Sequence, residues 1–284
     1  MTRTHPAQAL ERQADLIDKV QTPLYQGYCL YFLAAKYRTL AAGRVVSRPE
    51  DGGGPIWPGD RQRARSFLDR QLIALRAAET YHVADEMTPM IGWMAGKLRE
   101  ADCLSAEHLP SPIGFAWFDD RLFVQDVRGK QVGIRALLWQ RGVNEAGQPG
   151  IYLVHYSDPR FPDEVDASMA PADLTRARQM GSLIVDHVEF FAFGVPVGPV
   201  DMAALLRAGE DEEWATAVVD NHHRLLLGYF LLLQQKIVKT EPTTVHAGSG
   251  HRRKRRMNVP DRVQVVTLRE TVYPRREAGA GADV

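Results

Sequence analysis

Apolar residues recur at helical spacing through the first third of the chain. The segments ALERQADLIDKV and LYQGYCLYFLAAKYRTLAA place apolar side chains three or four positions apart, and a charged segment over 60–79 keeps the same period. This spacing predicts amphipathic helices. Thr22 and Pro23 open the second segment, and such a pair is typical of a helix start. We therefore predict a helical region over 6–100.

The period changes in the middle of the chain. Short segments rich in aromatic and β-branched residues alternate there with turn sequences, namely IGFAWFDD, RLFVQDV, QVGIRALLWQ, GIYLVHYSD and later SLIVDHVEFFAFGV. Such segments favour strands joined as an antiparallel meander. The pattern predicts a sheet-rich region over 111–195.

The last third is predicted to combine one helix and one strand. A long helix is expected over 212–239, with Pro242 as its stop, and VQVVTL predicts a last strand over 262–269. Helices and strands are segregated along the chain, which favours an α+β fold. We predict a single domain over 1–274, in which a helical N-terminal layer and the long C-terminal helix pack on an antiparallel sheet of about five or six strands. The Gly/Ala-rich segment 275–284 is expected to be a disordered tail.

Composition indicates a globular protein of the cytoplasm. The 284 residues are 45% hydrophobic and 25% charged, which is ordinary for soluble domains. The longest dense apolar stretch, LLLGYFLLL, is about half of a membrane span, which needs roughly 20 residues. The two cysteines, Cys29 and Cys103, show no metal or redox spacing, so we expect them to be reduced. We therefore expect a cytoplasmic location and no membrane partner.

Charge is unevenly distributed although the net charge is zero. The segment from residue 252 to the end carries nine Arg or Lys and four Asp or Glu, a net +5, so the remainder carries −5. Its densest part is RRKRR, in which all five residues could neutralise phosphates: Arg252, Arg253, Lys254, Arg255 and Arg256. Three other roles compete with nucleic-acid binding, namely a solvated linker, docking to an acidic surface of a second subunit, and contact with an anionic membrane.

The segment TYHVADEM is the first candidate for chemistry. It contains Tyr81, His82, Asp85 and Glu86 within six positions. On a helix, a His and a Glu four residues apart face the same way, so they could form an acid/base pair. The alternative is a structural connection before a helix starting at Thr88, with the carboxylates near a positive helix end.

The segment IVDHVEFF is the second candidate. On a strand, His187 and Glu189 share one face and Asp186 points to the other. These side chains could line a site, or one face of the sheet could simply be hydrated.

The segment DNHHR, residues 220–224, is the third candidate. Adjacent histidines on a helix lie about 100° apart and do not chelate one ion from one face. The positions four residues from His222 and His223 hold no metal-ligating side chain, so a metal would need distant ligands. We also find no P-loop, GxGxxG, HExxH or GxSxG motif. We therefore expect no metal and no cofactor.

The order AETYHVADEM, HLPSPIGFAWFDDRL, GIRALLWQ, RRKRR and VQVVTLRE resembles that of uncharacterised proteins from high-GC actinobacteria and their phages or plasmids. The resemblance implies a mobile-element or host cytoplasmic setting. It implies no catalytic residue.

Three functions follow from these patterns as hypotheses. The first is a non-catalytic, nucleic-acid-associated or regulatory protein that uses the basic segment for phosphate contacts. The second is an enzyme with a polar site near 81–86 and 186–189. The third is an assembly protein that forms a homo-oligomer through its long Leu-rich helix.

Overall fold

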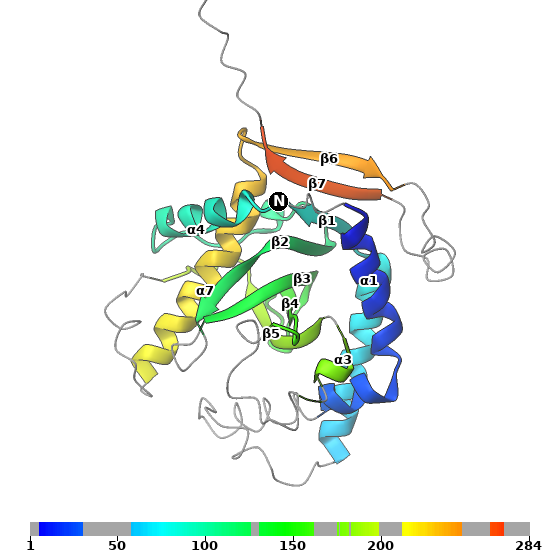
Figure 1. The fold of residues 1–284 in the computed structure, drawn as a ribbon. Coiled ribbons are helices and arrows are strands. Elements are labelled where there is room, and N and C mark those ends of the chain that lie inside the picture. Colours follow the sequence, from blue (N-terminus) through cyan, green and yellow to red (C-terminus); the bar gives the residue numbers. More distant parts are fainter. Residues whose placement is uncertain are drawn as a thin grey trace, which may run out of the picture.

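One seven-stranded mixed sheet organises the chain (Figure 1). The computed structural model describes residues 6–30, 58–125, 131–161, 175, 177–181, 183–198, 212–245 and 262–269. The strands are β1 (Glu79–Val83), β2 (Ile113–Gln125), β3 (Gln131–Val143), β4 (Pro149–Ser157), β5 (Ile184–Ala192), β6 (Val238–Thr244) and β7 (Arg262–Leu268). Their order across the sheet is β5-β4-β3-β2-β1-β7-β6. Strand β1 is parallel to both of its neighbours, and the other pairs are antiparallel.

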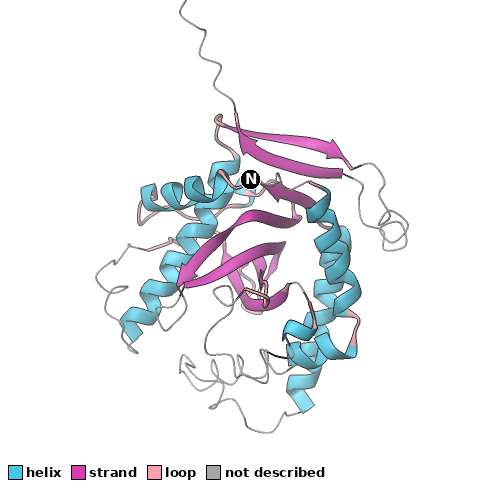
Figure 2. Ribbon diagram, viewed as in Figure 1, coloured by secondary structure: helices cyan, strands magenta, loops and turns pink. Residues whose placement is uncertain are grey.

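Helices cover the sheet on two sides (Figure 2). They are α1 (Ala7–Val20), α3 (Pro58–Ala77), α4 (Met87–Lys97), α7 (Glu212–Leu233) and the short 3-10 helix η2 (Ala106–His108). Residues 23–30 are also helical. Because successive strand side chains point to opposite faces, the sheet contributes to two separate cores. One core packs against α1 and α3, and the other packs against α4 and α7.

The predicted antiparallel sheet of five or six strands is wrong, although the class is α+β. The meander predicted for the middle of the chain is present as β2 to β5. Two further strands, β1 and β6, extend the sheet on its other side together with β7. Parallel pairing of β1 with β2 and β7 makes the sheet mixed. The single helical layer is also wrong, because α4 packs on the opposite face from α1 and α3.

Strand β1 replaces the helix or connection considered for residues 80–86. Four of its five residues are buried, and it lies between β2 and β7. A strand of five residues shows little periodicity of its own, so its neighbours in the sheet decide its conformation. The next helix begins at Met87, and the Thr88 hydroxyl donates to the Asp120 carbonyl oxygen (2.9 Å) instead of capping that helix.

The long helix predicted over 212–239 is wrong in its extent. Helix α7 ends at Leu233, and the chain continues directly into β6. Pro242, the predicted helix stop, lies inside β6 opposite Gln264. Strand β6 is at the edge of the sheet, where a residue without an N–H can be accommodated.

Close packing against α4 holds α7 in place. A Cβ atom added at Gly228 would lie 2.9 Å from the Ala95 backbone nitrogen, so only glycine lets the helices approach this closely. The buried Arg224 donates to the carbonyl oxygens of Leu98 and Gly198. Leu98 follows the last turn of α4, where a cation is favourable. These contacts determine which side chains of α7 face β4 and β5.

Three further predictions concern the basic segment, the C-terminal tail and the Leu-rich helix. The basic segment 252–256 and the tail 275–284 lie outside the described residues. The apolar residues of α7 are used within the chain, because Leu226, Leu227 and Leu232 are fully buried in the core on the α4 side. Within the described part of the chain, none of the helices combines the length and apolar character needed to cross a bilayer.

Candidate metal centre

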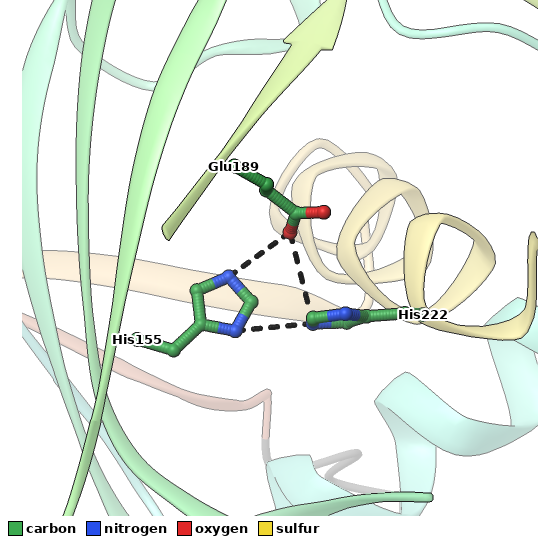
Figure 3. A group of neighbouring side chains, drawn as sticks. All are labelled: His155, Glu189 and His222. Carbon is green, nitrogen blue, oxygen red and sulfur yellow. Dashed lines mark hydrogen bonds and ion pairs between the residues drawn. The ribbon is translucent and has the colours of Figure 1, made fainter. Parts of the chain in front are cut away.

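Two histidines and one glutamate converge between the sheet and α7 (Figure 3). His155 comes from β4, Glu189 from the adjacent β5, and His222 from α7. His155 Nε2 lies 3.1 Å from Glu189 Oε1, and His155 Nδ1 lies 3.1 Å from His222 Nε2. His222 Nε2 is 3.8 Å from Glu189 Oε1. One potential ligand atom from each residue lies within 4.8 Å of the others.

The strand pairing explains why these side chains meet. Antiparallel pairing places His155 opposite His187, while Glu189 lies opposite Leu153, two residues before His155. Leu153 belongs to the core that faces α7. Alternation along both strands therefore directs His155, His187 and Glu189 toward α7.

The contact at the centre of this cluster lacks hydrogen-bond geometry. His155 Nε2 and Glu189 Oε1 form a buried ion pair at 3.1 Å, and neither atom makes a hydrogen bond to another described residue. Buried polar atoms in folded proteins are almost always hydrogen-bonded or bound to an ion. This imperfectly satisfied pair is therefore a local indication that the cluster holds a ligand.

Two more histidines surround the same carboxylate. His223 Nε2 lies 3.1 Å from Glu189 Oε2, and the His223 ring stacks on Phe191 at 4.5 Å. His187 Nε2 lies 3.8 Å from Glu189 Oε2. Side-chain exposure rises from 1% for His155 to 43% for His187. The cluster thus extends from the buried His155 to the solvent-exposed His187.

The electrostatic environment favours ligands ready to bind a cation. Burial lowers the pKa of His222 well below its usual value; Glu189 opposes this shift, and the neighbouring imidazoles reinforce it. Burial alone would raise the pKa of Glu189, but attraction by His222 and contacts with the other three histidines lower it well below its usual value. Near neutral pH His222 is therefore neutral and Glu189 is a carboxylate, the forms that coordinate metals.

The donor set fits a divalent transition metal. Imidazole nitrogens suit zinc, iron and nickel, and two histidines with one carboxylate form a recurrent ligand set of catalytic zinc and non-haem iron sites. The His155–His222 contact joins two nitrogens through one proton, and a metal ion would take the place of that proton. His223, bonded to the free oxygen of Glu189, is placed to orient this ligand.

The structure separates the two polar segments that the sequence suggested as one site. His187 and Glu189 belong to the cluster, whereas His82 Nε2 contacts Asp119 Oδ1 at 2.9 Å. The neighbouring Thr80 bonds to Gln13 of α1, so alternation along β1 places His82 on the α1 side of the sheet.

The remaining candidates of that segment also lie elsewhere. The Tyr81 hydroxyl donates to Glu79 (2.7 Å), and the Tyr81 ring packs against Trp139 at 5.3 Å. Glu86 is exposed just before α4. The five phosphate-contact candidates lie outside the described residues.

Sequence inspection missed His155 and the role of His222. The absence of partners four residues away argued against a metal at His222, but its partners come from two strands. The signal in the sequence was the presence of His, Asp and Glu within two strands that are otherwise rich in apolar residues, YLVHYS and VDHVEFF. That signal indicates buried polar side chains without showing that they meet.

A scan against protein-family models and a search of curated proteins gave no match. The resemblance to actinobacterial and phage proteins gains no support from these comparisons.

Proposed function

We propose that this protein is a metal-dependent enzyme that binds one divalent first-row transition metal through His155, Glu189 and His222. The convergence of one potential ligand atom from each residue within 4.8 Å carries the proposal. The buried His155–Glu189 contact lacks hydrogen-bond geometry, and coordination of one cation by both atoms would satisfy them.

A catalytic role fits the ligand count better than a structural one. Structural zinc sites usually use four protein ligands, whereas catalytic sites use three and keep a position for a small molecule. The described residues supply three ligands within coordination reach, and His187 leads from them to solvent. A bound metal would supply Lewis acidity toward an oxygen atom of water or substrate.

Metal titration of the full chain tests this proposal. After treatment with a chelator, the protein is titrated with Zn²⁺, Mn²⁺ and, without oxygen, Fe²⁺ by calorimetry. We expect about one ion per chain and a rise in melting temperature on binding. Loss of a ligand in Glu189→Gln or His222→Gln should weaken affinity by at least about 100-fold, and His223→Gln, which removes an orienting contact, by about tenfold.

A matched control separates the centre from general histidine binding. His108 lies in η2, and its ring nitrogen accepts the Ser105 N–H at 3.1 Å, so His108→Gln should leave metal affinity unchanged. The proposal is wrong if no metal binds at micromolar concentration, or if Glu189→Gln binds as tightly as the natural chain.

Nucleic-acid binding through the basic segment is a second proposal, supported by the charge difference of +5 against −5. Replacing Arg252, Arg253, Lys254, Arg255 and Arg256 by Gln should abolish retention of the protein on nucleic acid at low salt. Unchanged retention would contradict it. Both proposals take the setting to be the cytoplasm, which the free Cys29 and Cys103 support.

A further inference from the structure

A cleft of about 320 Å³ lies on the opposite side of β5 from the metal centre. Helix α3 forms one wall, and β3, β4 and β5 form the other. Val188, Glu189 and Phe190 of β5 line it, and Glu189 turns its carboxylate toward α7. The size is at the lower end of the range for small-molecule sites.

The interior of the cleft is mainly aromatic. Phe67 of α3 faces Tyr152 and Phe190 of the sheet, and the latter two rings meet edge to face at 4.9 Å. Glycines make room for these rings. A Cβ at Gly150 would lie 2.6 Å from the Phe190 ring, and one at Gly142 would lie 3.0 Å from the Tyr152 ring. These walls suit a flat apolar body.

One guanidinium group lies at the α3 wall of the cleft. Arg70 comes from α3 and lies 5.6 Å from the centre of the Tyr152 ring. It is exposed and is not paired with a carboxylate among the described residues. Arg141 of β3 borders the cleft but turns its guanidinium to the other face of the sheet, where it lies 6.0 Å from the centre of the Phe193 ring. Guanidinium forks match carboxylate oxygens in shape and charge.

A buried amide supplies a polar contact at the α3 wall. Gln71 lines the cleft and is 3% exposed. Its Nε2 donates to the hydroxyls of Tyr156 (2.6 Å) and Tyr25 (3.3 Å), while its Oε1 is buried without a hydrogen-bond partner. A ligand hydroxyl could donate to that oxygen.

We propose that this cleft binds a hydroxylated aromatic carboxylate. The ring lies among Phe67, Tyr152 and Phe190, the carboxylate bonds to Arg70, and the hydroxyl donates to Gln71 Oε1. The charge of Arg70 selects an anion over a neutral or cationic molecule. The cleft borders the same β5 residue, Glu189, as the candidate metal centre, but the proposed ligand contacts none of the metal-ligating atoms.

Calorimetry with hydroxyphenylpropanoate and two matched compounds tests the proposal on the full chain. Phenylpropanoate lacks the hydroxyl and should bind about fivefold more weakly, and hydroxyphenylpropanol lacks the charge and should bind at least about tenfold more weakly. The variant Arg70→Gln should lose at least about tenfold in affinity for the acid and nothing for the alcohol. Arg70 is exposed, so this variant keeps the fold, which circular dichroism checks.

Two controls complete the experiment. Arg76 is exposed in the last turn of α3 and does not line the cleft, so Arg76→Gln should bind the acid as the natural chain does. His222→Gln, on the other side of the sheet, should also bind it normally. The proposal is overturned if acid and alcohol bind equally, or if the Arg70→Gln variant binds the acid as tightly as the natural chain.

Discussion

Two buried polar networks on opposite faces of the sheet use different chemistry. On the α1 and α3 side, the buried network around Gln13 consists of neutral groups. Gln13 Nε2 donates to the Leu75 carbonyl oxygen (2.7 Å), and its Oε1 accepts from the Thr80 hydroxyl. On the α7 side, four imidazoles surround the ionised Glu189.

This difference separates a structural network from the candidate site. Gln13 joins α1 to the end of α3 and to β1, and it satisfies a carbonyl left free by the end of the helix. In the candidate metal centre, by contrast, His155 Nε2 and Glu189 Oε1 meet without hydrogen-bond geometry. The neutral, satisfied network of Gln13 stabilises a single packing arrangement, whereas the charged cluster retains buried atoms that a bound cation would satisfy.

The largest effect is expected from breaking the neutral network. Gln13→Leu should lower the free energy of unfolding by about 3 kcal/mol, because the Thr80 hydroxyl and Leu75 carbonyl remain buried without their partner. Metal affinity should not change. Urea denaturation and metal calorimetry measure the two effects. Gln21→Leu, at an exposed amide just after α1, is the control and should lower the free energy of unfolding much less. If Gln13→Leu lowers the free energy of unfolding no more than Gln21→Leu does, the structural role of Gln13 is contradicted.

An intermediate effect is expected where α7 touches α4. Gly228→Ala should lower stability by about 2 kcal/mol, because the new methyl meets the Ala95 backbone at 2.9 Å. Metal affinity should also fall, since α7 carries His222. The control Gly96→Ala has open space and should gain up to about 1 kcal/mol from helix propensity. If Gly228→Ala and Gly96→Ala raise the melting temperature equally, the close contact between α4 and α7 is not needed for stability, and the prediction is wrong.

The smallest effect concerns Lys19 on the α1 side. Burial lowers its pKa to about 8, with attraction by Asp15 opposing the shift. An unfolded lysine has a pKa of about 10.5, so between these values the unfolded chain binds more protons, and stability rises with pH. We expect a rise of about 1 kcal/mol.

Comparison with Lys19→Met tests this pH dependence. Urea denaturation between pH 7 and about 9.5 should show the rise in the natural chain and not in the variant. Both chains retain the buried Tyr25 and Tyr156, whose pKa values burial raises, so the difference between the chains isolates the lysine. Parallel stability curves would refute the assignment.

Local patterns were sufficient for the meander and for individual helix starts. The Thr22 hydroxyl accepts the Tyr25 N–H at 3.3 Å, as expected of a capping residue. In the β3–β4 turn, Asn144 Oδ1 accepts the N–H groups of Ala146 and Gln148, and Gly147 has a φ of 79°. Such features depend on a few neighbouring residues, so a short stretch of sequence contains every residue needed to predict them.

The sequence by itself thus determined that this chain forms an α+β fold with an antiparallel meander, and that His187 and Glu189 share one face of a strand. Only the tertiary structure decided that β1 lies inside the sheet, that Pro242 belongs to an edge strand, and that His155 and His222 join Glu189. The physical reason is the separation along the sequence between the residues that interact. Periodicity and capping act over a few residues, whereas strand order and helix packing bring together side chains whose spacing in the sequence carries no trace of their contact.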